Sequence, residues 1–456
     1  MTPLQLVTVC AVLSSSLCKP IGAQAAQPPS VADWGHDVDA IVRDIRTTHP
    51  DPFTITGRVT FLRAAQALRQ ALPSLSEEQR VAAAMRLVAS IGDGHTQLEP
   101  NGNARFSDWY PIRLYEFTDG FFVTTAHRSV GELAGAEVLN IAGHPAAEVV
   151  AAARTLMGAD NAFGRLENLY AVHSASLMKG LGYAAADGSL RVTCKLRDGT
   201  VVERTLVPRK TNSPGVSPDD ANFGTWSSRR EMFGPPIDSA AEWVAAFRQL
   251  PATAFRVADT TRPPHLMNPR LQMTYALPAW KAYYIQLNFI NNTSTETFPG
   301  LIQRALREVD ELKPRRLIVD LRYNYGGDGS AVRAMIQEFI ARQNHQPWNE
   351  LYVLVGRRTF SAAILALGEF LDYTQVTLVG EPPGAARNAF GDAMTFEYPR
   401  TGLHLRVSTV RHQGLASTDL SEIIPVDVPA RFSFADYAAG RDPAVDPILR
   451  GDEMRS

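Results

Sequence analysis

Three stretches of the 456-residue chain hold residue types suited to nucleophilic catalysis. Ser361 precedes an apolar stretch of helical pattern, so its hydroxyl would lie near the positive end of a helix dipole. Gly326-Gly327 permits a sharp turn and leaves backbone N–H groups unobstructed. Such groups, with the N–H of Ala362, can stabilise the oxyanion that forms when a hydroxyl attacks a carbonyl. His95 lies on a glycine-flanked loop and could act as the general base.

Each of these residues also has an explanation without catalysis. Serine is a favoured N-cap residue of helices, and Gly-Gly occurs in many loops. His95 could be a solvated loop residue, or a metal ligand with Asp93 and Glu99, although no second histidine stands nearby. Spacing cannot establish a pair between His95 and Ser361, because such partners meet only in the fold.

The loops that hold Gly326-Gly327 and Ser361 each follow a short, continuous apolar run, at 317–321 and 351–355. Such runs are typical of strands covered on both faces of a parallel sheet. Apolar helical stretches at about 330–342 and 362–371 lead to a further strand at 375–379. The pattern predicts β-α-β-α-β with right-handed crossovers. Both loops should therefore open at the carboxyl edge of one sheet, where sites form in such folds.

Other segments predict the surroundings of this sheet. Residues 31–92 predict three helices, and a capping box at Ser76 opens the third. Between 105 and 207, short strands, a helix and an Asp198-Gly199 hairpin signal resemble a PDZ-like module, a fold that binds extended peptides by strand addition. A β-subdomain without a ligand is the alternative. The remaining predicted elements are a helix at 238–250, a strand at 281–288, an amphipathic helix at 297–312 and a hairpin at 394–407.

The composition of the chain restricts the partners that the protein can bind and the compartment in which it is found. The net charge of −2 gives no support for nucleic acid or an anionic membrane as a partner. Residues 1–25 predict a cleavable signal peptide, whose removal leaves Cys194 as the only cysteine and excludes an intramolecular disulfide. The apolar stretch is too short for a membrane span. We therefore expect an exported, periplasmic or secreted protein with no stable membrane anchor, no metal and no cofactor.

Six motifs, together with the region around Pro425, resemble those of the tail-specific (C-terminal-processing) serine peptidases, especially the branch that includes tricorn. They occur in the family's order and span most of residues 31–450. Each motif alone is weakly specific, but the ordered set is strong. The motifs are Gly92-Asp93-Gly94-His95-Thr96, Asp320-Leu321-Arg322-x-Asn324-x-Gly326-Gly327, Thr359-Phe360-Ser361-Ala362-Ala363, Gly380-Glu381-Pro382-x-Gly384, Asn388-x-Phe390-Gly391-Asp392 and Gly440-Arg441-Asp442-Pro443.

The resemblance implies an α/β fold with a crotonase-like peptidase core. It also implies an N-terminal helical subdomain and a PDZ-like β insert. No motif falls in the segment before the core, which we expect to be a linker or insert. The expected divisions are a helical subdomain at 31–104 carrying His95, the PDZ-like subdomain at 105–207, the linker at 208–275 and the core at 276–450 carrying Ser361.

By the same resemblance, Ser361 matches the nucleophile and His95 the base, with Gly326, Gly327 and Ala362 at the oxyanion hole. Asp419, six positions before Pro425, matches the carboxylate that orients the base, where the tricorn-like branch carries a glutamate. The local motif reads Pro425-Val426-Asp427, so Glu422 is a rival to Asp419.

Two departures from the family pattern bear on mechanism. Gly94 stands where tricorn has a serine, so one orienting hydroxyl is missing. No lysine occurs from Ser361 to Ser456, which removes the Ser-Lys mechanism of the bacterial branch. Arg387 lies near the expected lysine position, but a guanidinium does not deprotonate in proteins. His95 is therefore the leading base.

The sequence thus predicts a serine peptidase that acts on peptides or unfolded proteins, with the oligomeric state open. The alternative is a weak or inactive homologue that binds peptides or apolar ligands, because retinoid-binding proteins share this core. An esterase of the α/β-hydrolase type is disfavoured, because the residues around Ser361 lack the G-x-S-x-G elbow.

Overall fold

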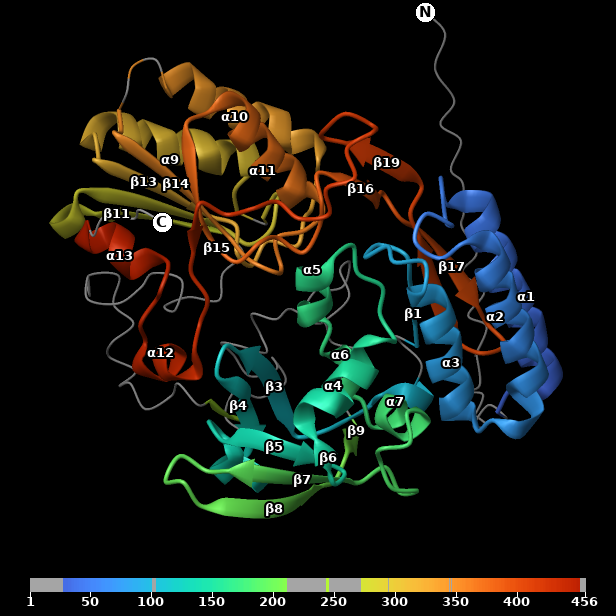
Figure 1. Cartoon of the computed structure of the whole chain (residues 1–456). Helices are drawn as coiled ribbons and strands as arrows, with labels where there is room; N and C mark the ends of the chain where they lie inside the picture. Colours follow the sequence, from blue (N-terminus) through green and yellow to red (C-terminus); the bar gives the residue numbers. More distant parts are fainter. Residues whose placement is uncertain are drawn as a thin grey trace, which may run out of the picture.

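The computed structural model describes residues 28–100, 104–210, 243–245, 272–293, 295–343, 345 and 347–451. The expected signal peptide and most of the expected linker lie outside these residues. None of the described helices combines the length and apolar character that crossing a bilayer requires. The fold is mixed α/β, with several sheets (Figure 1).

A six-stranded sheet forms the C-terminal half of the fold. Its order is β11-β12-β13-β14-β15-β20, and all neighbours except β11 and β12 pair in parallel. The predicted β-α-β-α-β order is confirmed, because continuous apolar runs can be buried on both faces only inside such a sheet. The strands are β11 (Gln272–Leu277), β12 (Ala282–Leu287), β13 (Arg316–Asp320), β14 (Glu350–Val355), β15 (Val376–Gly380) and β20 (Val428–Pro429).

Helices cover both faces of this sheet (Figure 1). On one face, α9 (Phe298–Leu312), α10 (Ser330–Gln343) and α11 (Ala362–Tyr373) bury apolar side chains against β13 and β14. On the other face, the short α13 (Val445–Arg450) packs its apolar residues against the same strands. The carboxyl edge of the sheet stays open for the loops after β13 and β14.

Three N-terminal helices form as predicted, and they are joined by a hairpin from far along the chain. The helices are α1 (Val31–Thr48), α2 (Arg58–Ala71) and α3 (Glu77–Ala89). The next strand, β1 (Gln97–Glu99), pairs antiparallel with β18 (Leu403–Val407), which pairs with β17 (Met394–Tyr398). The predicted 394–407 hairpin is confirmed, but its place beside the N-terminal helices was not predicted.

The middle of the chain forms a separate antiparallel sheet with small helices against it (Figure 1). The predicted hairpin at Asp198-Gly199 is confirmed as β7 and β8. The strands of the sheet include β3 (Ile112–Phe117), β4 (Gly120–His127), β5 (Glu137–Ile141), β6 (His144–Pro145), β7 (Leu190–Lys195) and β8 (Val201–Leu206). The strands β2 (Asp108–Trp109) and β9 (Arg209–Lys210) pair with each other in a separate two-stranded sheet. The helices are α4 (Ala146–Arg154), α5 (Ala162–Glu167), α6 (Tyr170–His173) and α7 (Ala175–Gly180).

The predicted helix at 238–250 is wrong where the structure describes it. Residues 243–245 form β10 (Trp243–Ala245), which pairs antiparallel with β4. A short apolar run such as Trp-Val-Ala fits a helix or a strand equally well, and the free edge of β4 supplies the backbone partners that decide between them. The other residues of this prediction lie outside the described part of the chain.

The C-terminal tail also completes the core through a buried ion-pair network. Arg322, at the end of β13, donates to Asp320 at 2.7 Å and to Asp442 at 3.0 and 2.9 Å. Its side chain is 6% exposed, and those of the two carboxylates are 1% and 0% exposed. Tyr284 also donates to Asp320. The two carboxylates raise the pKa of Arg322 despite its burial. This network fixes the start of the loop that continues to Gly326-Gly327.

Asp442→Asn should strongly destabilise the protein, because it leaves a buried guanidinium partly uncompensated. Removing one partner of a buried pair costs about 3–5 kcal/mol. The free energy of unfolding in urea, followed by circular dichroism, measures the loss. Glu369→Gln, which removes the partner of the exposed Arg333, should cost much less. Equal losses in the two variants would show that the buried network does not hold the tail in place.

Candidate active site

Ser361 lies at the turn between β14 and α11 in an unusual backbone conformation. Its φ is 55° and its ψ is −128°, and its side chain makes no capping hydrogen bond to α11. A non-glycine residue with positive φ is uncommon and costs roughly 1–3 kcal/mol, so other contacts must hold it there. The alternative of a simple N-cap serine is therefore excluded. Its half-buried side chain lines a cavity instead.

The glycine turn after β13 lies directly against Ser361. A Cβ added to Gly326 would stand 2.6 Å from the Cβ of Ser361 and 2.9 Å from its Oγ. A Cβ on Gly327 would stand 2.1 Å from the carbonyl oxygen of Ile290. Their φ angles are 122° and 131°, a region that favours glycine. Both glycines are therefore required by close approach and by backbone conformation.

Two of the three expected oxyanion donors remain suitable. The N–H of Gly326 donates to Oδ1 of Asn324 at 2.9 Å, so this part of the prediction is corrected. The amide is buried and needs a partner, and the Asn324 side chain supplies one. Within the described residues, the N–H groups of Gly327 and Ala362 make no hydrogen bond, and Ala362 is the first residue of α11. These two amides form the candidate oxyanion hole.

His95 is held by the loop between α3 and β1. Its ring stacks on that of Phe360, with centroids 4.3 Å apart and planes at 25°. A Cβ on Gly94 would stand 2.8 Å from Phe360, so any larger residue at this position would collide with the ring. Within the described residues, the buried Nδ1 of His95 has no hydrogen-bond partner. The Phe360 ring therefore orients an imidazole that lacks a hydrogen bond at Nδ1.

Asp93 fixes the histidine loop. Its carboxylate accepts the backbone N–H of His95 at 2.8 Å and the hydroxyls of Thr96 at 2.5 Å and Ser408 at 2.6 Å. It also contacts Nε2 of His49 at 3.1 Å. Burial alone would raise the pKa of Asp93, but these partners lower it to about 2. Asp93 therefore carries a negative charge beside His95, and its oxygens serve the loop rather than a metal.

The surroundings of His95 favour the neutral base. Burial lowers the pKa of its imidazole to about 4. Asp93 opposes this shift, Arg406 and His412 add to it, and Asp392 opposes it. Nε2 of His412 lies 3.3 Å from the carboxylate of Asp392. At neutral pH the imidazole is therefore in its neutral form and can accept a proton.

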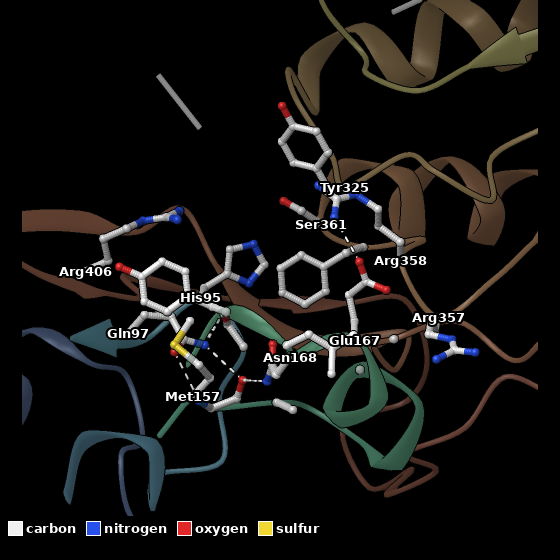
Figure 2. Close-up of a pocket in the computed structure, with 18 of the residues that line it drawn as sticks. His95, Gln97, Met157, Glu167, Asn168, Tyr325, Arg357, Arg358, Ser361 and Arg406 are labelled. Atoms are coloured by element: carbon white, nitrogen blue, oxygen red, sulfur yellow. Dashed lines mark hydrogen bonds and ion pairs between the residues drawn. The ribbon is translucent and has the colours of Figure 1, made fainter. Parts of the chain in front are cut away.

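The structure brings His95 and Ser361 to the same cavities. Both side chains line a pocket of about 260 Å³ with Tyr325, Phe360 and Gly327 (Figure 2). A second cavity beside it is also lined by both residues. Within the described residues no hydrogen bond joins the two side chains. Catalytic hydrogen bonds are often long in ligand-free structures and tighten when substrate binds.

Asp419 is not brought into contact with His95. Its carboxylate accepts the N–H of Ser421 at 2.8 Å, and its carbonyl accepts from Asn388 on the strand β16 (Asn388–Gly391) at 3.1 Å. The hydrogen bonds of Ser421 lower the pKa of Asp419. The side chain of Glu422 is exposed, and its carbonyl accepts from Asn161 at 2.9 Å. Within the described residues neither carboxylate reaches the imidazole.

Sequence reasoning missed three residues that shape the site. The sequence could have drawn attention to Phe360, because it directly precedes the candidate nucleophile. Its stacking on a histidine far away in the chain cannot be inferred from the order of the residues. The same holds for Arg406 on β18, which lines the pocket. Glu167, the last residue of α5, forms an ion pair with Arg358 at 3.0 Å. It also lines the pocket, so the helices beside the middle sheet contribute to the pocket wall.

Comparison with known proteins supports the fold. No family model and no curated protein matches the sequence. Mature CPAF in complex with lactacystin matches with a TM-score of 0.62 and 12% identity, over 92% of this chain and 99% of that chain. Mature CPAF matches with a TM-score of 0.57 and 11% identity, over 93% of this chain and 98% of that chain.

The tricorn protease matches with a TM-score of 0.38 and 13% identity, over 92% of this chain and 36% of that chain. The structural neighbours are tail-specific serine peptidases. The predicted resemblance is thus confirmed for the fold, and at these identities the likeness shows the fold alone.

Activity should persist well below neutral pH. The base works in its neutral form, which predominates above its pKa, so kcat/KM should be nearly constant from pH 7 to 5 and fall by half near pH 4. A pH series on a single peptide measures this. Arg406→Gln should move the midpoint upward, because the guanidinium lowers the pKa of His95. A midpoint near 6.5 in the unmodified protein would contradict the buried, neutral imidazole.

Ala362→Pro should remove one oxyanion donor without ending the helix. Proline lacks the N–H but is tolerated at the first position of a helix. Loss of one donor costs about 10²–10³ in kcat. Ala362→Gly, which keeps the N–H, is the matched control and should lose far less. Equal kcat in the two variants, both with unchanged unfolding curves, would remove Ala362 from the oxyanion hole. Gly327→Val is a poor test, because its side chain would strike Ile290.

Proposed function

We propose that the protein is a serine peptidase that hydrolyses peptide bonds through an acyl-enzyme on Ser361, with His95 as the general base. One observation carries the proposal. Ser361 is held in a costly backbone conformation, uncapped, between two unpaired N–H groups and in the same cavities as a buried histidine. A structural serine needs none of these features, whereas a nucleophile requires a nearby base and donors for the oxyanion.

The chemistry follows from these positions. Oγ of Ser361 attacks the carbonyl carbon of the scissile bond, and Nε2 of His95 takes the hydroxyl proton. The carbonyl oxygen becomes an oxyanion and accepts from the N–H groups of Gly327 and Ala362. When the intermediate collapses, His95 gives the proton to the departing amine. Water, activated by His95, then attacks the acyl-enzyme and releases the second product, with Ser361 regaining its proton.

Asp419 is proposed as the carboxylate that orients His95. The buried Nδ1 of the imidazole needs an acceptor if Nε2 is to take a proton. The tether of Asn388 to the Asp419 carbonyl keeps Asp419 beside β16, the strand that continues to Phe390 and Gly391. A Cβ on Gly391 would lie 3.9 Å from the His95 ring, so this strand reaches the imidazole. Asp392 and Glu422 are the competing carboxylates.

The finer parts of the sequence-based interpretation belong to the same proposal. We propose a crotonase-like core for the six-stranded sheet and a PDZ-like role for the middle sheet in holding extended peptides. Peptides or unfolded proteins are the proposed substrates, because the structural neighbours are peptidases. Export to the periplasm or medium is proposed from the signal-like residues 1–25.

A fluorophosphonate probe and a peptide library test the function. Ser361 should be labelled covalently, as read by mass spectrometry of the digested protein, and Ser361→Ala should not be labelled. Residues that act as one unit lose activity non-additively. Ser361→Ala, His95→Ala and the double variant should therefore be almost equally inactive on a cleaved peptide. Labelling absent in the folded wild-type protein, with no peptide cleaved, would leave the ligand-binding alternative.

Kinetic measurements on further variants test which carboxylate orients His95. Asp419→Asn should lower kcat more than Glu422→Gln or Asp392→Asn, with a smaller effect on substrate binding. A larger loss in Glu422→Gln would assign the orienting role to Glu422. Unfolding curves of all variants control for stability.

A further inference from the structure

Arg406 differs from the other arginines of the pocket. Arg357 pairs with Glu381 at 3.1 Å, and Arg358 pairs with Glu167 at 3.0 Å. Within the described residues, Arg406 makes no hydrogen bond or ion pair, although its half-buried side chain lines the same pocket. Fully buried charges are normally paired, and the half-buried Arg406 has lost part of its hydration without gaining a partner. The guanidinium is therefore available to bind an anionic group of a bound molecule.

The strand that carries Arg406 does not need this side chain. Leu405 and Val407 point into the hydrophobic core formed with the N-terminal helices, and Arg406 lies on the opposite face of β18. Its neighbour across the sheet is Gln97 on β1. The pairing of β1 with β18 uses backbone groups, so an uncharged residue at 406 would serve the fold equally well.

Arg406 places a positive charge at this end of the pocket. Glu99 also lines the pocket, and its carboxyl group interacts electrostatically with Arg406. Burial raises the pKa of Glu99, and Arg406 and His404 only partly oppose the shift. Arg406 lines the same pocket as His95 and Ser361, so a substrate residue near the scissile bond can meet its guanidinium. In the view of Figure 2, the His95 ring lies between Arg406 and Ser361.

We propose that Arg406 binds the carboxylate of an aspartate or glutamate side chain in the substrate, a few residues from the scissile bond. The inference rests on the proposed peptidase function and names its substrate class as acidic peptides. A guanidinium can hold a carboxylate through two parallel hydrogen bonds, which gives both energy and orientation. The carboxylate would also complete the charge balance of the pocket.

Cleavage of matched peptides tests the preference. Each pair carries glutamate or glutamine at one position on either side of the scissile bond, with acetylated and amidated ends, so that only the side chain supplies a carboxylate. At pH 7, the wild-type protein should prefer glutamate at one position by at least about ten-fold in kcat/KM. Arg406→Gln should reduce that ratio to near one, and Arg406→Glu should turn the preference towards lysine.

Two controls sharpen the result. Arg406→Lys keeps the charge and should retain part of the preference, whereas Arg411→Gln removes an exposed arginine outside the pocket lining and should retain all of it. A wild-type ratio near one at every position, or a full preference in Arg406→Gln, overturns the proposal. So does a preference that requires a free chain end, measured with an unamidated neutral peptide, because the bound group is then the terminal carboxylate.

Binding to the Ser361→Ala variant separates this inference from the proposed function. Fluorescence anisotropy of the labelled glutamate and glutamine peptides measures affinity without cleavage. If the wild-type protein cleaves no peptide but the variant binds the glutamate peptide more tightly, and Arg406→Gln abolishes the difference, the peptidase proposal fails while the carboxylate site stands. If peptides are cleaved without any acidic preference in rate or binding, only the Arg406 proposal fails.

Discussion

The pairing of β1 with β18 is the interaction on which the candidate site depends. Only three residues of β1 take part, yet this pairing joins the N-terminal helices to the hairpin that leaves the core. Thr96 and Ser408 reinforce it with a hydrogen bond of 3.1 Å between residues 312 positions apart. Ser408 also donates to Asp93, which fixes the backbone of His95. Together with the stacking of His95 on Phe360, this contact holds His95 beside the nucleophile loop.

The backbone conformation of Ser361 depends on the packing of the residues around it. Ser361 adopts a positive φ because its neighbours leave no alternative: Gly326 approaches within van der Waals contact, and the apolar residues of α11 are buried against the sheet. The buried pairing of Arg322 with Asp442 holds the preceding loop from the opposite side. The stability of the sheet thus supports a conformation that the serine would not adopt by itself.

Much of the core was predictable because its signals are local. The runs at 317–321 and 351–355 are apolar except at Asp320, and the glycine and serine loops follow them directly, so both loops had to share one edge. The pairing of β1 with β18 left no local signal, because backbone hydrogen bonds between distant segments do not constrain residue types. Side-chain details were equally hidden: Asn324 occupies the N–H of Gly326, and Phe360 orients His95. Trp243–Ala245 joined a strand edge that the segment itself does not encode.

The long sequence separation within the site sets a time at which it can first exist during synthesis. A ribosome releases the helices and the loop of His95 early, and Ser361 much later, but β18 must follow before β1 has a partner. Asp442 emerges later still, and until then Arg322 lacks half of its buried counter-charge. Contacts of such separation are formed late, because closing long loops costs entropy before any contact forms. A partly made chain therefore carries both reactive groups without the arrangement that would let them act on other nascent proteins.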